Sequence, residues 1–225
     1  MNKVKLFAAM VVTAGSFMAF AAPATAQTFG FKLGPTWANL DAEGDDDGLN
    51  RLQSLGGGGF VRFGMMGIGM QAEVLAMTKG SSQDVEDIDG NDVGDIDLKL
   101  DYIEVPLLAR FSMGSTMPFS PYIMVGPSFA FNYGCSFEGD SEDDEIEDEE
   151  LDCDDDALGG DILEIKSFDI GATGALGFEF RAGPGAILVE GRYTHGFMDV
   201  FDVEGDDNAK NRQFAVMAGY SFSMR

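Results

Sequence analysis

The stretch FDIGATGALGFEFR at residues 168–181 decides the fold. Its even positions are apolar or glycine, whereas its odd positions are small, polar or charged. A repeat of two places each set on its own face of an extended strand. The same alternation occurs in residues 29–37 and 214–222. These segments are therefore predicted to be strands with one apolar face.

Eight segments are predicted to be strands: 28–39, 54–64, 68–78, 98–112, 120–133, 165–181, 186–197 and 212–224. Short connections near 65–67, 114–118 and 182–185 alternate with long loops at 40–53, 79–97, 134–164 and 198–211. Barrels of the outer membrane have short turns at one end and long loops at the other. The predicted fold class is all-β, an eight-stranded antiparallel up-and-down transmembrane β-barrel over residues 27–225.

The N-terminus has the layout of a secretory signal peptide. Lys3 and Lys5 precede an apolar run at 6–22, and Ala24-Thr25-Ala26 forms a small-residue cleavage site. The alternative, a retained transmembrane helix, needs about 20 apolar residues, and this run has 17. We expect residues 1–26 to be cleaved on export and the mature chain to reach the outer membrane.

The acidic residues are concentrated in the predicted long loops. The chain has 39 acidic and 14 basic residues and a formal net charge of -25. Within the four predicted long loops, the stretches 41–47, 84–97, 138–156 and 199–207 hold 31 of the acids. So acidic a chain repels phosphate, which argues against a nucleic-acid partner. The calcium-like pattern from Glu43 to Gly48 has Ser54 where a bidentate Glu is needed. No specific metal site is therefore predicted, only weak attraction of divalent cations, chiefly by Asp143, Asp144, Glu145, Glu147, Asp148, Glu149 and Glu150.

Several short motifs resemble one known family. LDYIEVPLLARF at 100–111, PYIMVGPS at 121–128, GRYTHG at 191–196 and GYSF at 219–222 are similar to the PorT-like outer-membrane β-barrel domain family. The resemblance implies an eight-stranded barrel in the envelope of a Gram-negative-type cell and carries no shared catalytic residues. Three functions stay open: a structural or surface-interaction protein, a small porin, and a component of a secretion or envelope-assembly machine. Outer-membrane lipid is an expected partner, and the sequence identifies no protein partner.

The strand register predicts which charges face the barrel interior. Five are basic and five acidic: Lys32, Arg62, Arg110, Arg181 and Arg192, with Glu73, Glu104, Asp169, Glu179 and Glu190. Eight strands leave an interior just wide enough for side chains, and an unpaired buried charge is costly. The balance favours a plug of ion pairs, while a charge-lined channel is the alternative.

Cys135 and Cys153 flank the most acidic predicted loop. After export they are expected to form a disulfide, the alternative being two free thiols. A Ser/His/Asp set would have to combine His195 with Asp199 or Asp202 and Ser221 or Ser223, but no nucleophile elbow is present. The chain is therefore predicted to be non-enzymatic, with no catalytic residue and no cofactor.

Aromatic residues near the predicted strand ends are expected to form membrane-interface girdles: Trp37, Tyr102, Phe119, Tyr122, Phe131, Tyr133 and Phe197. Four consecutive glycines, at 56–59, indicate either a bend or the close approach of an interior side chain.

Overall fold

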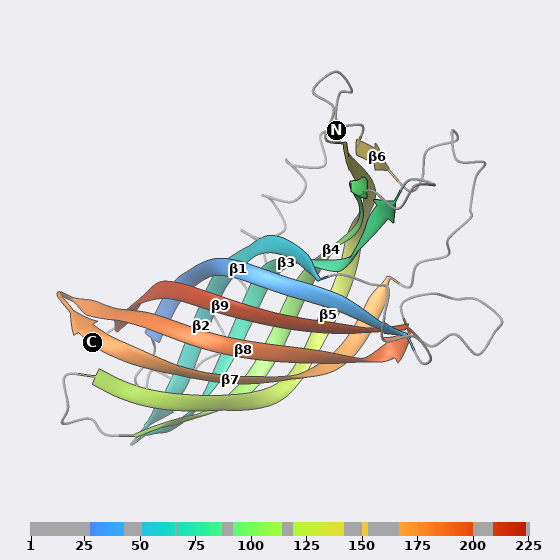
Figure 1. Ribbon diagram of the computed structural model, residues 1–225. Coiled ribbons are helices and arrows are strands. Elements are labelled where there is room, and N and C mark those ends of the chain that lie inside the picture. Colours follow the sequence, from blue (N-terminus) through green and yellow to red (C-terminus); the bar gives the residue numbers. More distant parts are fainter. Residues whose placement is uncertain are drawn as a thin grey trace, which may run out of the picture.

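The computed structural model describes residues 28–42, 51–65, 67–86, 92–113, 119–141, 150–152, 167–199 and 209–223. These residues form a closed antiparallel β-barrel (Figure 1). Its strands are β1 (Thr28–Ala42), β2 (Leu52–Met65), β3 (Ile68–Glu86), β4 (Asp92–Ser112), β5 (Phe119–Ser141), β7 (Phe168–Ala182), β8 (Gly185–Asp199) and β9 (Ala209–Ser223), and a short strand β6 (Glu150–Asp152) pairs with the end of β5.

Each barrel strand pairs with its neighbour in the chain, and β1 pairs with β9 to close the ring. The β1–β9 ladder runs from Thr28 opposite Ser223 to Ala42 opposite Ala209. Closure leaves no barrel strand with an unpaired edge, which a backbone in hydrocarbon requires. The predicted eight-stranded up-and-down barrel is confirmed.

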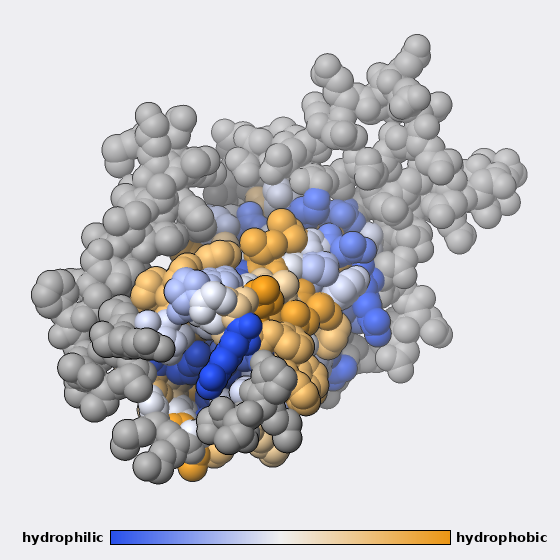
Figure 2. All heavy atoms as spheres, turned by 90° about the vertical axis from the view of Figure 1, so that its left-hand side faces the viewer, coloured by the Kyte–Doolittle hydropathy of each residue, from blue (hydrophilic) through white to orange (hydrophobic). Residues whose placement is uncertain are grey.

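The alternation read from the sequence decides which face of each strand is buried. In β7, Asp169, Gly171, Thr173, Ala175 and Gly177 are buried, and the apolar side chains between them point outward. Figure 2, seen from the left-hand side of Figure 1, shows hydrophobic side chains around the outside of the barrel and hydrophilic ones within the ring. The polar interior and apolar exterior are those of a barrel that meets lipid.

Two predicted short turns are visible. Gly67 has φ +84° before β3, and Gly183 has φ +61° between β7 and β8. Both values lie in the left-handed region that glycine enters without strain. Glycine at these two positions lets the chain reverse within a few residues.

The strands extend further than predicted, mainly in β3, β4 and β5. These have 19, 21 and 23 residues, against 14 or 15 in the other barrel strands. The predicted loop at 79–97 is corrected accordingly, because the β3–β4 ladder continues to Glu86 opposite Asp92. Backbone hydrogen bonds drive this pairing and do not require apolar side chains.

The other three predicted loops are shortened in the same way. β1 ends at Ala42 and β2 begins at Leu52, so the loop predicted at 40–53 begins and ends inside strands. The segment 134–164 contains the end of β5 and β6, and 198–211 contains the ends of β8 and β9. The predicted signal peptide, 1–26, lies outside the described residues. No helix in the described ranges has the length and apolar character needed to cross a membrane.

Candidate functional site

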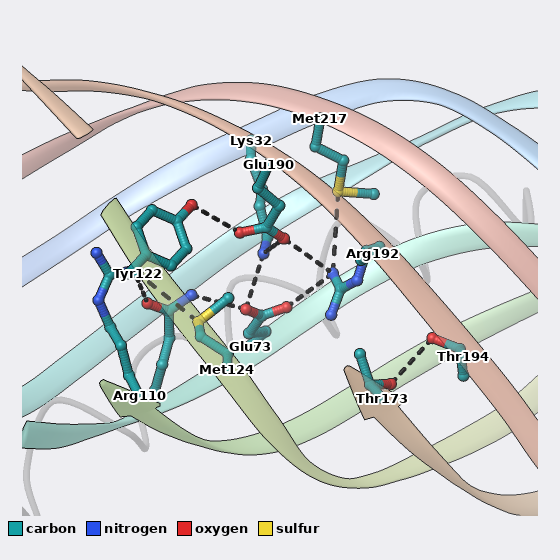
Figure 3. Close-up of polar contacts among 11 residues, drawn as sticks. Lys32, Glu73, Arg110, Tyr122, Met124, Thr173, Glu190, Arg192, Thr194 and Met217 are labelled. Atoms are coloured by element: carbon teal, nitrogen blue, oxygen red, sulfur yellow. Dashed lines mark hydrogen bonds and ion pairs between the residues drawn. The ribbon is translucent and has the colours of Figure 1, made fainter. Parts of the chain in front are cut away.

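The centre of the barrel holds a buried cluster of four charges, here called the central cluster: Lys32 on β1, Glu73 on β3, and Glu190 and Arg192 on β8 (Figure 3). Lys32 Nζ donates to Glu73 Oε1 at 2.8 Å and to Glu190 Oε1 at 2.6 Å. Arg192 Nη1 donates to Glu73 Oε2 at 2.9 Å and lies 3.9 Å from Glu190 Oε1. Each cation thus contacts both carboxylates. The two positive and two negative charges make the cluster neutral.

A second group of charges lies nearer the short turns and is called the turn-side cluster: Arg62 on β2, Arg110 on β4 and Glu179 on β7. Arg62 Nη1 lies 2.8 Å from Glu179 Oε1, and Arg110 Nη2 lies 2.9 Å from Glu179 Oε2. Arg110 also stacks on the ring of Tyr122, its guanidinium carbon 3.5 Å from the ring centroid. The negative face of this ring attracts the guanidinium and so stabilises the second positive charge of the cluster.

Tyr122 connects the two clusters. Its hydroxyl donates to Glu190 Oε2 at 3.0 Å while its ring lies against Arg110. Gln71 adds a further contact to the central cluster, because its Nε2 donates to Glu73 Oε1 at 2.7 Å. A continuous chain of polar contacts therefore runs from Arg62 to Arg192.

A third group lies on the side of the predicted long loops. Lys79 Nζ donates to Glu104 Oε1 at 3.1 Å, and both side chains are almost fully buried. Lys79 also lies 5.0 Å from the ring centroid of Tyr102. Asp169 accepts weak hydrogen bonds from the Met198 amide at 3.4 Å and from Asn211 Nδ2 at 3.5 Å.

Nine of the ten charges predicted to face the interior lie there, and one does not. Arg181 follows the inward parity of β7 but is exposed at the strand end, so its predicted interior position is corrected. Lys79, which the sequence analysis assigned to a loop, takes its place as the fifth interior cation. Lys79 continues the alternate, inward-facing positions of Glu73, Leu75 and Met77 along β3. This alternation is the signal in the sequence that identifies Lys79 as an interior residue. With this exchange the described interior still holds five basic and five acidic groups.

Two aromatic residues expected in the girdles are also corrected. Tyr102 and Tyr122 are almost fully buried inside the barrel, where they contact Lys79 and Arg110. Tyr133, Phe119, Phe131 and Phe197 are exposed on the outer face, and Trp37 is half-buried.

The four-glycine stretch lies where β2 is crowded from both sides. A Cβ on Gly56 would come within 2.6 Å of Met77 Sδ, an interior side chain. A Cβ on Gly58 would come within 2.0 Å of the Val74 carbonyl oxygen. The expected close approach of an interior side chain is therefore present at Gly56, and a backbone approach adds to it at Gly58.

Acidic residues face one another across the extended parts of β3, β4 and β5. The register places Asp84 opposite Asp95, and Asp95 opposite Asp140, in one row across the three strands. A second row places Asp97 opposite Glu138, and Glu138 opposite Glu150 on β6. Like charges in directly opposed positions repel each other. Nearly all of the predicted cation-attracting set, from Asp143 to Glu149, lies outside the described residues, as do most of the acids in the other long loops.

The described residues contain no group of three or more His, Cys, Asp and Glu side chains arranged to hold a metal ion. The residues considered for catalysis are not brought together. His195 pairs with Arg212, whereas Ser221 pairs with Ala186, nine residues before His195 on β8. At about 3.4 Å per residue this separates His195 and Ser221 by roughly 30 Å.

The disulfide stays a prediction. The described residues include no free cysteine, and Cys135 lies half-buried beside Leu100, Tyr102 and Ala130. Its expected partner, Cys153, lies outside the described residues.

The arrangement as a whole fills the barrel with side chains. Charged layers alternate with apolar contacts, including Leu75 and Met217 in one buried cluster and Leu108 and Met124 in another. Inside an eight-stranded barrel there is room for these side chains and little else. The charges of the central cluster are paired with one another in this interior.

A closed antiparallel barrel with a polar interior and an apolar outside defines the class of outer-membrane β-barrels. The family comparison agrees: residues 9–222 match the model of the outer membrane protein beta-barrel domain, and the chain belongs to that family. The narrower resemblance to the PorT-like barrels stays a prediction. A comparison with curated proteins gave no match.

Solved outer-membrane barrels resemble the chain at low identity. Outer membrane protein OprG from Pseudomonas aeruginosa is 14% identical with a TM-score of 0.47, over 89% of this chain and 97% of that chain. Neisserial surface protein A is 11% identical with a TM-score of 0.45, over 85% and 95%. Ail from Yersinia pestis, in complex with the heparin analogue sucrose octasulfate, is 14% identical with a TM-score of 0.42, over 88% and 99%. At these scores the likeness carries no argument about function.

Proposed function

We propose that this protein is a closed, non-enzymatic outer-membrane barrel that presents an acidic, cation-attracting face outside the cell. The observation that carries the proposal is the pair of acidic rows on the extended parts of β3, β4 and β5 and on β6. In each row three acidic residues hold consecutive cross-strand positions. Lys99 lies 4.0 Å from Asp97, but no basic residue holds a register position in either row, so the rows are unfavourable in the absence of further counterions.

Divalent cations relieve this repulsion. Directly opposed residues on antiparallel strands have Cβ atoms about 4.5 to 5.5 Å apart, so one ion can interact with carboxylates from two strands. Without a complete ligand cage the binding is weak, collective and sensitive to monovalent salt. The acids of the predicted loops, Asp143 to Glu150 included, add to the same field.

Titration calorimetry with calcium chloride at low and high sodium chloride tests the acidic face. The informative variant replaces Asp84, Asp95 and Asp140 with Asn. The matched control replaces Asp45, Asp46 and Asp47 with Asn, which removes the same charge from another segment. We expect the row variant to bind less calcium than the control and the wild-type affinity to fall as sodium chloride rises. A single tight site indifferent to salt, or no loss of calcium in the row variant, would overturn the proposal.

The ion pairs in the interior argue against the alternative function of a small porin. The central cluster pairs each of its charges inside the narrowest possible type of lumen, which supports a barrel that does not conduct. Planar-bilayer recording of the refolded chain should show no steady channels. Regular unitary currents would instead favour the porin.

The third role, a component of a secretion or envelope-assembly machine, rests on the resemblance to the PorT-like family alone. A machine component needs a stable protein partner, whereas the acidic face acts through cations or basic surfaces. Crosslinking in intact cells distinguishes the two, because one recurring partner that stays bound in high salt would favour the machine.

A further inference from the structure

A groove of about 570 Å³ lies on the outer side of the barrel where β1, β8 and β9 approach the predicted long loops. Its described lining consists of the aromatic residues Trp37, Tyr193 and Phe214 and the polar residues Asn39, Arg51, Arg212 and Gln213. Among these described lining residues none is acidic, although acids outnumber bases 39 to 14 in the whole chain. The described lining of the groove is therefore basic on a very acidic protein.

The strand register arranges the lining in two rows across the outer face. In the first row Phe214 pairs with Trp37 on one side and with Tyr193 on the other. The ring centroids of Trp37 and Phe214 are 5.8 Å apart. Tyr193 and Phe214 are 47% and 46% exposed, so this aromatic row faces the surroundings of the barrel.

The second row lies two residues closer to the loops and is polar. Arg212 pairs with Asn39 and with His195. Arg51 directly precedes Leu52, the partner of Ala38, and is exposed like Arg212. In the next row Lys210 holds the register position opposite both Asp41 and Asp199.

The membrane boundary falls between these two rows. The outward side chains of β1 are apolar from Phe29 to Trp37, and Phe29 stacks on Phe222 at the other end of the belt, with ring centroids 5.2 Å apart. Eight residues span about 27 Å along the strand, or about 20 Å across the membrane at the usual tilt, close to the height of an outer-membrane apolar band. The aromatic row then lies at the interface, and the two arginines lie at the level of the lipid headgroups.

We propose that this groove binds the phosphorylated headgroup of an outer-leaflet lipid. Guanidinium groups bind phosphate through paired, charge-assisted hydrogen bonds, and two of them line the same groove. The aromatic row beneath them packs against the upper part of the acyl chains. The site brings the barrel into direct contact with an anionic lipid, although the negative net charge of the chain repels the same headgroups.

Trp37 makes the groove directly observable, because it is the only tryptophan in the chain and lies in the lining. The full chain, refolded in a neutral detergent, is titrated with diphosphoryl lipid A while tryptophan emission is recorded. EDTA is present throughout, so cation bridges to the acidic face do not contribute and a failure here leaves that proposal untouched. Dephosphorylated lipid A and inorganic phosphate serve as the two comparison ligands.

We expect a saturable change in Trp37 emission with the phosphorylated lipid and none with either comparison ligand. The double variant Arg51→Gln with Arg212→Gln should weaken binding about tenfold or more, since each lost charge-assisted contact is a strong one. The control Arg181→Gln removes an exposed arginine at the opposite end of the barrel and should leave the affinity unchanged. If the double variant does not refold, each single variant must weaken binding on its own.

Three results would overturn the proposal. The first is equal affinity of the wild type and the arginine variants. The second is an equal response to dephosphorylated lipid, which would show a purely apolar contact. The third is a response to inorganic phosphate as strong as that to the lipid, which would show an anion site unrelated to the membrane.

Discussion

Replacing Glu73 with Gln should destabilise the barrel more than any exposed carboxylate-to-amide change. Glu73 is fully buried and accepts hydrogen bonds from Lys32, Arg192 and Gln71 at 2.8, 2.9 and 2.7 Å. The substitution leaves two cations and only Glu190 in the central cluster. Removing one partner of a buried pair costs about 3 to 5 kcal/mol. The lower end of this range applies, because Glu190 still contacts Lys32 at 2.6 Å.

The free energy of unfolding is measured by urea titration in lipid vesicles. The matched control is Asp97→Asn, which breaks a partly exposed pair with Lys99 at 4.0 Å and should cost less than about 1 kcal/mol. A double variant, Lys32→Met with Glu73→Gln, restores neutrality and should recover much of the loss. The reasoning fails if Glu73→Gln costs no more than the control, or if the effects of Lys32→Met and Glu73→Gln simply add.

Three further predictions concern the strands and loops. Gly58→Ala should lower the free energy of unfolding by about 1 to 3 kcal/mol because its Cβ meets the β3 backbone, whereas Gly59→Ala, whose nearest contact is at 3.7 Å, should be close to neutral; equal effects would contradict this. Mass spectrometry of the unreduced protein should find Cys135 linked to Cys153, and alkylation of both thiols without reductant would exclude the bridge. Protease added to intact cells should cut within 134–164, and cutting only after permeabilisation would reverse the orientation.

The outer face of the barrel was predictable because it obeys a single rule. Every lipid-facing position must be apolar or small, so alternation with a period of two marks each strand and its register. The same parity predicted that Lys32, Glu73, Glu190 and Arg192 lie inside. The sequence did not predict which of these side chains contact one another. Contacts across the interior depend on the stagger of the strands in the closed barrel.

The residues whose positions differ from the sequence prediction do so for different reasons. Lys79 was assigned to a loop because Gly80 and the serines after it end the apolar pattern, although the backbone pairing continues. Tyr102 was assigned to a girdle by residue type, although it shares the inward parity of Glu104. Arg181 has the inward parity but lies at a strand end, where the barrel no longer covers its side chain. Parity gave the correct face for Lys79 and Tyr102 and failed only for Arg181, at the end of its strand.

The sequence separation within the central cluster determines when in biosynthesis the cluster can assemble. Lys32 and Glu190 are 158 positions apart, and Glu73 and Arg192 are 119 apart. Neither contact can form before the C-terminal part of the chain has been synthesised and folded against the first strands. Until β9 joins β1, the four charges therefore stand on an open, hydrated sheet. Closure of the seam between the first and last strands brings these charges together and removes the water around them.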